Sequence, residues 1–199
     1  MSSELFIQNS VKIRDSKVFK NGELVFQVDR DLNLNKFLKE IYKEQNLNYP
    51  KFFKMDSLSK LGYLGVELLT NGNIQNKETA LVFANSASSL ETDTAFAESL
   101  KDFPSPSLFV YTLPNIMLGE ISIRHQLKSE NCFFISEAFD PGLFINYCTA
   151  LFQQKKAENL LCGWVNLHNN EYDVFLWQIA PGGGTDFNEE ELKKLYLPT

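Results

Sequence analysis

Apolar and polar positions along the chain alternate with two different periods. Six segments are rich in β-branched and aromatic residues, which is typical of strands. They cover residues 5–13, 23–28, 79–86, 132–136, 160–167 and 174–180. Between them, apolar residues recur every three or four positions, which predicts amphipathic helices at about 34–45, 57–70, 91–100, 115–127 and 142–155. Strands separated by helix-length segments favour an α/β sheet with helices on its faces.

Local signals mark where several of these helices begin. Asn33, Asp56 and Asp140 precede apolar periodic segments and suit the N-cap position, and Pro141 suits the first helical position. The helix at 57–70 carries two glycines, at positions 62 and 65, each of which costs about 1 kcal/mol relative to alanine. We therefore expect another backbone to approach this helix closely.

The end of the chain has a different organisation. Only residues 168–171 separate the last two predicted strands, which is too short for a parallel crossover and predicts an antiparallel hairpin. Gly182–Gly184 then indicate a flexible joint. A segment resembling a capping box, 186–189, follows, and it predicts a short terminal helix that ends near Tyr196.

Length and charge limit the class of protein. A chain of 199 residues suits one domain, so we expect a single domain over 1–199. Nineteen Lys and Arg against twenty-five Asp and Glu give a net charge of −6 without a basic run, so we expect no nucleic-acid partner. No stretch of 18 apolar residues and no signal-peptide pattern occur, so we expect no membrane span and a cytoplasmic location.

No local motif indicates a metal, a cofactor or a nucleophile. The three cysteines (132, 148 and 162) lack a C-x-x-C spacing, and His125 and His168 lack the spacing of a zinc site. The glycine run at 182–184 lacks the remaining residues of a nucleotide-binding loop. We expect no cofactor and no metal, and buried structural thiols are the preferred interpretation of the cysteines. An unrelated enzyme would have to assemble its chemistry from Cys148, Cys162, Glu120 or Glu137.

Several segments in the same order resemble a known family. They are KFFKMDSLSKLGYLGVELL (51–69), ALVFANSASSLETD (80–93) and FPSPSLFVYTLPNIMLGEISIRHQLKSEN (103–131), followed by the strand, turn and helix at 132–155. Together they resemble the N-terminal half of the β-ketoacyl synthases of the thiolase superfamily. This resemblance implies a thiolase-like half with a five-stranded mixed sheet in the order 3-2-1-4-5, the last strand antiparallel, and helices on both faces.

The resemblance also implies that the chain is not an enzyme. The family places its catalytic cysteine at the turn before the helix 142–155, and Phe139 occupies that position here. A phenyl ring cannot accept an acyl group. The family's two histidines come from its C-terminal half, which we expect to be absent here, and His125 and His168 match neither of them.

The family resemblance also leads us to expect that the chain binds a partner. In the family, the strand before the nucleophile position pairs with its counterpart across a two-fold axis, which here is residues 131–136. The resemblance therefore implies a partner-binding or acyl-binding role for a set of ten residues. They are Phe109, Thr112, Asn115, Ile116, Met117, Cys132, Phe133, Phe134, Ile135 and Phe139.

We expect a reduced subunit similar to a chain length factor. It would pair with an active ketosynthase or an acyl carrier protein in fatty-acid, polyketide or aryl-polyene type biosynthesis. The alternative is a stand-alone homodimer that binds an acyl chain without catalysis. An acidic carrier protein would need a local basic surface, for which Lys51, Lys54 and Lys60, or Arg124 with Lys128, are candidates.

Overall fold

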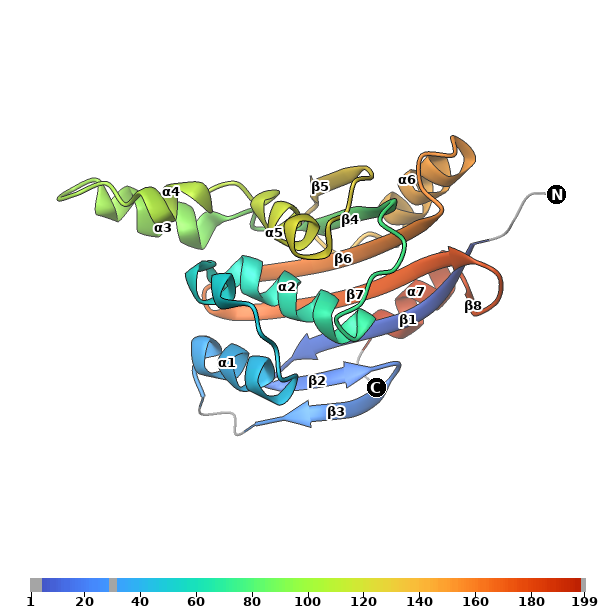
Figure 1. Cartoon of the computed structure of the whole chain (residues 1–199), viewed down its shortest axis with the longest axis horizontal. Helices are drawn as coiled ribbons and strands as arrows, with labels where there is room; N and C mark the ends of the chain where they lie inside the picture. Colours follow the sequence, from blue (N-terminus) through green and yellow to red (C-terminus); the bar gives the residue numbers. More distant parts are fainter. Residues whose placement is uncertain (1–4, 29–31, 198–199) are drawn as a thin grey trace.

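A mixed β-sheet with helices on both faces forms the body of the molecule (Figure 1). The computed structural model describes residues 5–28 and 32–197. The strands are β1 (Leu5–Arg14), β2 (Lys17–Lys20), β3 (Glu23–Gln27), β4 (Thr79–Asn85), β5 (Asn131–Ile135), β6 (Asn159–His168), β7 (Glu171–Pro181) and β8 (Thr185–Asp186). The helices are α1 (Leu34–Glu44), α2 (Ser57–Thr70), α3 (Leu90–Ser99), α4 (Pro106–Val110), α5 (Ile116–His125), α6 (Pro141–Gln153) and α7 (Glu189–Tyr196), with a short 3-10 helix η1 (Pro50–Lys54).

The strand order confirms the fold class and corrects its details. The order is β3-β2-β1-β7-β6-β4-β5, with β8 beside β1. Strands β4, β5 and β6 are parallel, and β7 is antiparallel to both β6 and β1, so the predicted hairpin and the antiparallel last strand are confirmed. The expected number of five strands and the order 3-2-1-4-5 are wrong, because the sheet has eight strands and β1 lies outside the hairpin instead of beside β4.

The turn after β1 explains this difference. Asp15 and Ser16 both have positive φ and join β1 to β2 as a tight antiparallel hairpin. A strand in a sheet has two edges, and β2 occupies one edge of β1 while β7 occupies the other. Strand β1 therefore cannot also pair with β4 in the middle of the sheet.

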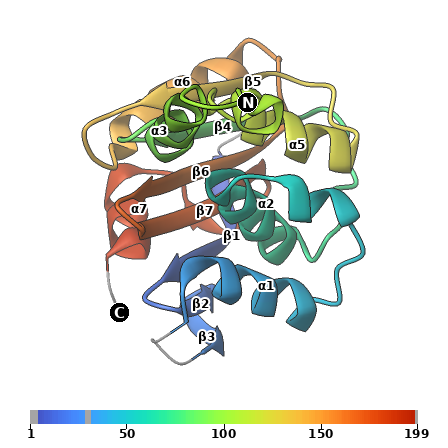
Figure 2. The same cartoon turned by 90° about the vertical axis from the view of Figure 1, so that its left-hand side faces the viewer.

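Alternating side chains of the strands build one core on each face of the sheet. On β4, Leu81 and Phe83 point into the core under α1, α2 and α5, whereas Val82 and Ala84 point into the core under α6 and α7. Figure 2 shows α1 and α2 on one side of the sheet and α7 on the other. All seven residues of β4 are buried, as expected for a strand covered on both faces.

The helix starts predicted from the sequence are largely confirmed by the observed N-caps. The side chains of Asn33, Asp56 and Asp140 each accept hydrogen bonds from backbone N–H groups at the start of α1, α2 and α6. The terminal helix forms as expected, although its cap is Asn188. The three glycines 182–184 all have positive φ, in the turn that leads to β8 beside β1. The single domain over 1–199 stays a prediction, and residues 1–4, 29–31 and 198–199 of it lie outside the described residues.

The two glycines of α2 do mark a close approach, although side chains make it. A Cβ atom at Gly62 would overlap the side chain of Met117, and one at Gly65 would meet a methyl carbon of Leu176 at 2.6 Å. Helix α2 is thereby held between α5 and the sheet. The expectation of a neighbouring backbone is corrected to neighbouring side chains.

Candidate functional site

The turn between β5 and α6 is fixed by hydrogen bonds at both ends. The N–H of Ser136 donates to the carbonyl of Asn85 at 2.9 Å, which extends the pairing of β5 with β4. The carboxylate of Asp140 accepts from the N–H groups of Gly142 and Leu143 at 2.9 and 3.3 Å and caps α6. Phe139 therefore lies at a strand-to-helix junction that is hydrogen-bonded at both ends, where the sequence placed it.

The ring of Phe139 is enclosed by aromatic side chains. Its centroid lies 4.2 Å from that of Tyr196 on α7, and four further rings lie 5.6 to 6.3 Å away. These four are Phe144, Trp164, Phe175 and Trp177. Position 139 is thus part of the core between the sheet, α6 and α7, and it presents no nucleophilic atom.

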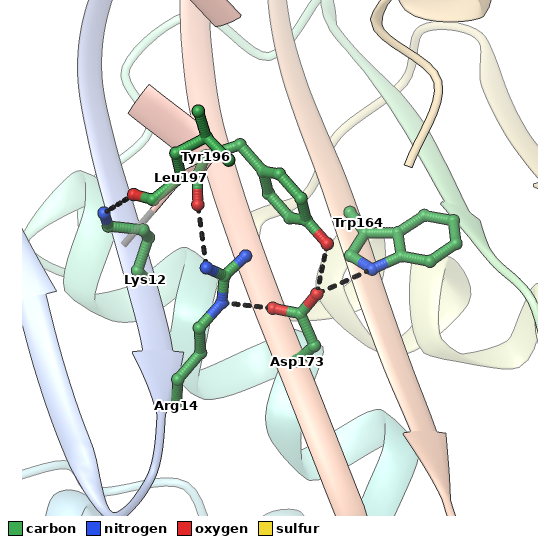
Figure 3. A network of polar contacts seen from close by, with 6 residues as sticks. All are labelled: Lys12, Arg14, Trp164, Asp173, Tyr196 and Leu197. Atoms are coloured by element: carbon green, nitrogen blue, oxygen red, sulfur yellow. Dashed lines mark hydrogen bonds and ion pairs between the residues drawn. The ribbon is translucent and has the colours of Figure 1, made fainter. Parts of the chain in front are cut away.

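A polar network joins the end of α7 to the sheet beside this aromatic cluster (Figure 3). Asp173 on β7 accepts hydrogen bonds from the Tyr196 hydroxyl at 2.6 Å and from Trp164 Nε1 at 3.1 Å, and it pairs with Arg14 of β1. Arg14 and Lys12 also donate to the carbonyls of Tyr196 and Leu197 at 2.7 and 3.0 Å. Cations at the last carbonyls of a helix stabilise its negative end.

The charges and the burial in this network shift two pKa values. Burial, together with the neighbouring carboxylate of Asp173, raises the pKa of the Tyr196 hydroxyl above its ordinary value. Burial and the charge of Arg14 lower the pKa of Lys12, although Asp173 opposes this effect. Sequence analysis missed the network, because its members are separated by up to 185 positions and carry no local signal.

Strand β5 ends the sheet and leaves one edge open. No strand lies beyond it in the part of the chain that the structure describes. Glu130 and Ser136 exchange hydrogen bonds with β4, and backbone direction alternates along a parallel strand, so the N–H and C=O groups of Asn131, Phe133 and Ile135 point away from β4. Ile135 is 55% exposed, and the side chains of Cys132, Phe133 and Phe134 are half-buried.

The helices α3 and α4 extend beyond the end of the sheet (Figure 1) and carry an unusual amount of apolar surface. Of the twelve large apolar side chains exposed among the described residues, six lie between 90 and 113: Leu90, Leu100, Phe103, Phe109, Val110 and Leu113. We call this set the α3–α4 apolar surface. Phe103 is 88% exposed. Half of the exposed large apolar side chains of the described residues are therefore concentrated in one segment of the chain.

The remaining predicted site residues divide between this surface and the core. Phe109 packs on Phe96 with ring centroids 5.3 Å apart, and the Thr112 carbonyl accepts a hydrogen bond from Ser89. Asn115 is exposed at the start of α5, and its side chain makes no capping bond.

The other predicted site residues lie on opposite faces of the sheet. Ile116, Met117 and Phe133 pack into the core under α2 and α5, whereas Phe134 and Phe139 pack into the core under α6 and α7. Phe134 also meets the ring of Tyr147 on α6 with centroids 5.0 Å apart. The predicted residues therefore do not form one pocket.

The candidate basic residues differ in their exposure and in whether they pair with a carboxylate. Lys51 pairs with the buried Glu120 at 2.8 Å, and Arg124 pairs with the buried Glu67 at 3.1 Å. Lys54 is exposed next to Phe53, itself 55% exposed. Lys60 lies over the ring of Phe52, and burial lowers its pKa, Asp56 opposing and Lys39 adding to this shift.

Of the four groups that an unrelated enzyme would need, only the two cysteines lie close together. The Sγ atoms of Cys148 on α6 and Cys162 on β6 lie 3.4 Å apart, and both residues are fully buried. Burial and the adjacent Cys148 raise the pKa of the Cys162 thiol. Glu120 is buried on the opposite side of the sheet, where it accepts a hydrogen bond from Tyr111, and Glu137 is exposed.

Two negative findings concern metals and membranes. Within residues 5–28 and 32–197, no three His, Cys, Asp or Glu side chains gather as metal ligands would. Over the same residues, every helix is too short or too polar to cross a lipid bilayer.

Comparison with known proteins identifies the fold. No protein-family model matches the chain, and no curated protein matches it in sequence. The solved structures do match: the chain has the thiolase-like fold of ketosynthases and chain length factors. The family resemblance seen in the sequence is therefore confirmed at the level of the fold.

Three solved structures illustrate the match. The ishigamide ketosynthase/chain length factor aligns with a TM-score of 0.64 and 16% identity over 90% of this chain and 62% of that chain. The ketosynthase ApeO in complex with its chain length factor ApeC, from Xenorhabdus doucetiae, aligns with a TM-score of 0.62 and 12% identity over 97% of this chain and 90% of that chain. The AntDE:AntF complex, a type II polyketide acyl-carrier protein with its ketosynthase, aligns with a TM-score of 0.61 and 11% identity over 98% of this chain and 65% of that chain. The chain thus spans less than two thirds of the first and third of these, and nearly all of the second.

Proposed function

We propose that the chain is a non-catalytic, ketosynthase-like subunit that pairs with an active ketosynthase through the open edge of β5. The observation that carries the proposal is the apolar edge of β5, which leads directly into the junction at Phe139, the residue that the sequence resemblance aligns with the family's cysteine. An apolar edge strand with free N–H and C=O groups is a poor surface to leave in water, and pairing with a second strand satisfies those groups.

The α3–α4 apolar surface supports the same proposal. It adds exposed aromatic and aliphatic side chains to the contact that a sheet edge alone would make. Aromatic side chains of this kind are enriched at protein interfaces. The fold supports it further, because structures with the same fold contain ketosynthases in complex with a chain length factor or a carrier protein.

The backbone directions in β5 allow a sharp test. The N–H of Ile135 points away from β4, so Ile135→Pro removes a donor from the open edge without removing one from the β4–β5 ladder. The matched control is Ile135→Thr, which shortens the apolar side chain and keeps the N–H. We expect Ile135→Pro to weaken binding to a purified ketosynthase at least 100-fold, and Ile135→Thr to weaken it less than tenfold.

Two results would contradict this pairing. The first is a ketosynthase complex that Ile135→Pro leaves unchanged, as measured by sedimentation. The second is a stable homodimer that the same substitution dissociates and that excludes the ketosynthase, which would favour the stand-alone acyl-binding alternative.

We further propose that an acidic carrier protein docks on the surface formed by Lys39, Lys54, Lys60 and Phe53. Residues 36–60 hold six lysines and three acidic residues, whereas the whole chain carries a net charge of −6. An exposed ring among lysines suits an acidic partner with an apolar contact. We expect Lys54→Glu to weaken carrier binding about tenfold and to reduce its salt dependence, whereas the same charge change at Lys155, on another surface, should have little effect.

A further inference from the structure

Two surfaces of opposite charge lie next to each other at one end of the molecule. One is the surface on α1, η1 and α2 that is proposed for the carrier protein, called the basic surface below. The other is carried by α3 and α4, and Figure 2 looks onto this end and shows α3 above α2 and α1. Thr92 Oγ1 donates a hydrogen bond of 2.7 Å to Asp56 Oδ2, which ties the start of α3 to the start of α2.

The segment 90–113, which contains α3 and α4, is acidic. It holds four acidic residues and one lysine and therefore carries a net charge of −3. The side chains of Asp93, Glu98 and Asp102 are exposed. We call residues 90–113 the acidic segment.

The neighbouring segment 36–60, which contains the basic surface, carries the opposite charge. It holds six lysines and three acidic residues, and Lys51 is occupied by the buried Glu120, which leaves a net charge of +2. Each segment also exposes an aromatic ring, since Phe53 is 55% exposed and Phe103 is 88% exposed. Aromatic rings are enriched at protein interfaces, and opposite charges across a contact guide its formation.

The two surfaces of one molecule lie side by side and do not cover each other, because both leave charged side chains exposed. A second copy, turned about a two-fold axis that runs between the two surfaces, would place its acidic segment on the basic surface of the first copy. The same rotation would place the acidic segment of the first copy on the basic surface of the second. Closed two-fold dimers of this kind are the commonest form of homo-oligomer.

We propose that two copies of the free chain form a symmetric dimer in which the acidic segment of each lies on the basic surface of the other. The proposal goes beyond the proposed function, because it concerns the chain without a ketosynthase or a carrier protein. The dimer covers the surface proposed for the carrier protein, so the dimer and the carrier complex exclude each other. It does not use the edge of β5, which distinguishes it from a homodimer formed by strand pairing.

Sedimentation of the wild-type chain alone gives the first test. At about 100 μM protein we expect a dimer, because a contact of micromolar affinity is largely formed at that concentration. Raising the salt from about 50 mM to about 500 mM should weaken the dimer at least tenfold, because salt screens the charges that hold it together. Ile135→Pro should leave the dimer unchanged.

Paired charge reversals give the sharper test. One variant combines Lys39→Glu with Lys54→Glu, and the other combines Glu98→Lys with Asp102→Lys; all four side chains are exposed. Each variant alone brings like charges together at both contacts and should sediment as a monomer. An equal mixture restores opposite charges at both contacts, so it should form a dimer with one copy of each variant. Lys155→Glu, which changes an exposed charge on another surface, should dimerise like the wild type.

Three results would overturn the proposal. They are a wild-type chain that remains a monomer at low salt, a dimer that survives in either doubly reversed variant, and a mixture of the two variants that associates no better than each alone. A dimer that Ile135→Pro dissociates would place the contact at β5 and would also contradict it. The ketosynthase-binding test measures a different contact, so a failure of this proposal can be told apart from a failure of the proposed function.

Discussion

Replacing Phe139 with alanine measures how much the aromatic ring at the β5–α6 junction contributes to the fold. The ring meets five aromatic neighbours, and the nearest, Tyr196, joins it to α7. A fully buried phenylalanine costs about 3–5 kcal/mol when it is cut to alanine. Because Phe139 is only half-buried, we expect a loss of about 2–3 kcal/mol in the free energy of unfolding.

Urea-induced unfolding, followed by tryptophan fluorescence, gives this value directly, since Trp164 and Trp177 both lie against the ring. In thermal unfolding the same loss corresponds to a fall in Tm of roughly 4–12 °C for a chain of this length. The matched control is Phe103→Ala, because that ring is 88% exposed and its loss should change stability by less than about 0.5 kcal/mol. Equal stability changes in the two variants would refute the placement of Phe139 in the core.

Three further outcomes are expected from other parts of the molecule. Gly62→Ala should lose about 1–3 kcal/mol by chemical denaturation, because the new methyl group overlaps Met117, whereas Gly119→Ala meets no atom within 4 Å and should not destabilise the protein. The raised pKa of Tyr196 means that the folded state holds this proton more tightly. Stability should therefore be complete below about pH 10 and fall above it, by at most about 1.4 kcal/mol per pH unit for this group, and the fall should be smaller in Tyr196→Phe. Iodoacetamide should modify Cys132 in the native protein and the two buried cysteines only after unfolding, as mapped by mass spectrometry; fast native labelling of a buried cysteine would contradict the structure.

The sequence predicted the elements with local signals. Helix caps are short-range hydrogen bonds, so Asn33, Asp56 and Asp140 could be read from their neighbours. The hairpin of β6 and β7 followed from the length of its turn. The pattern of apolar residues also placed α6 and the junction before it within one or two positions.

The position of β1 in the sheet depends on which strands pair with it, and the local sequence pattern does not indicate this. A strand rich in apolar residues can lie in the middle of a sheet or nearer its edge. Here the tight turn after β1 pairs β2 with one side of β1, and this fixes the position of β1. Strand β2 has only four residues, two adjacent apolar residues between two lysines, which is too short and too irregular a pattern to predict a strand. Helix α4, five residues long, was missed for the same reason.

The candidate site was predicted in part. The junction at Phe139 had a strand, a cap and a proline around it, which are local signals. The ring of Tyr196 over Phe139 and the contacts of Asp173 depend on tertiary packing between β1, β7 and α7. No pairwise spacing in the sequence indicates that these three elements meet.

Intact-mass spectrometry of a mixture of this chain, a ketosynthase and an acyl carrier protein loaded with an acyl group tests the central claim most directly. Under native conditions we expect a complex that contains one copy of this chain and the ketosynthase. After denaturation, the acyl group should be on the ketosynthase and absent from this chain, because Phe139 offers no nucleophile. An acyl adduct on this chain, or a ketosynthase that never forms the complex, would contradict the account.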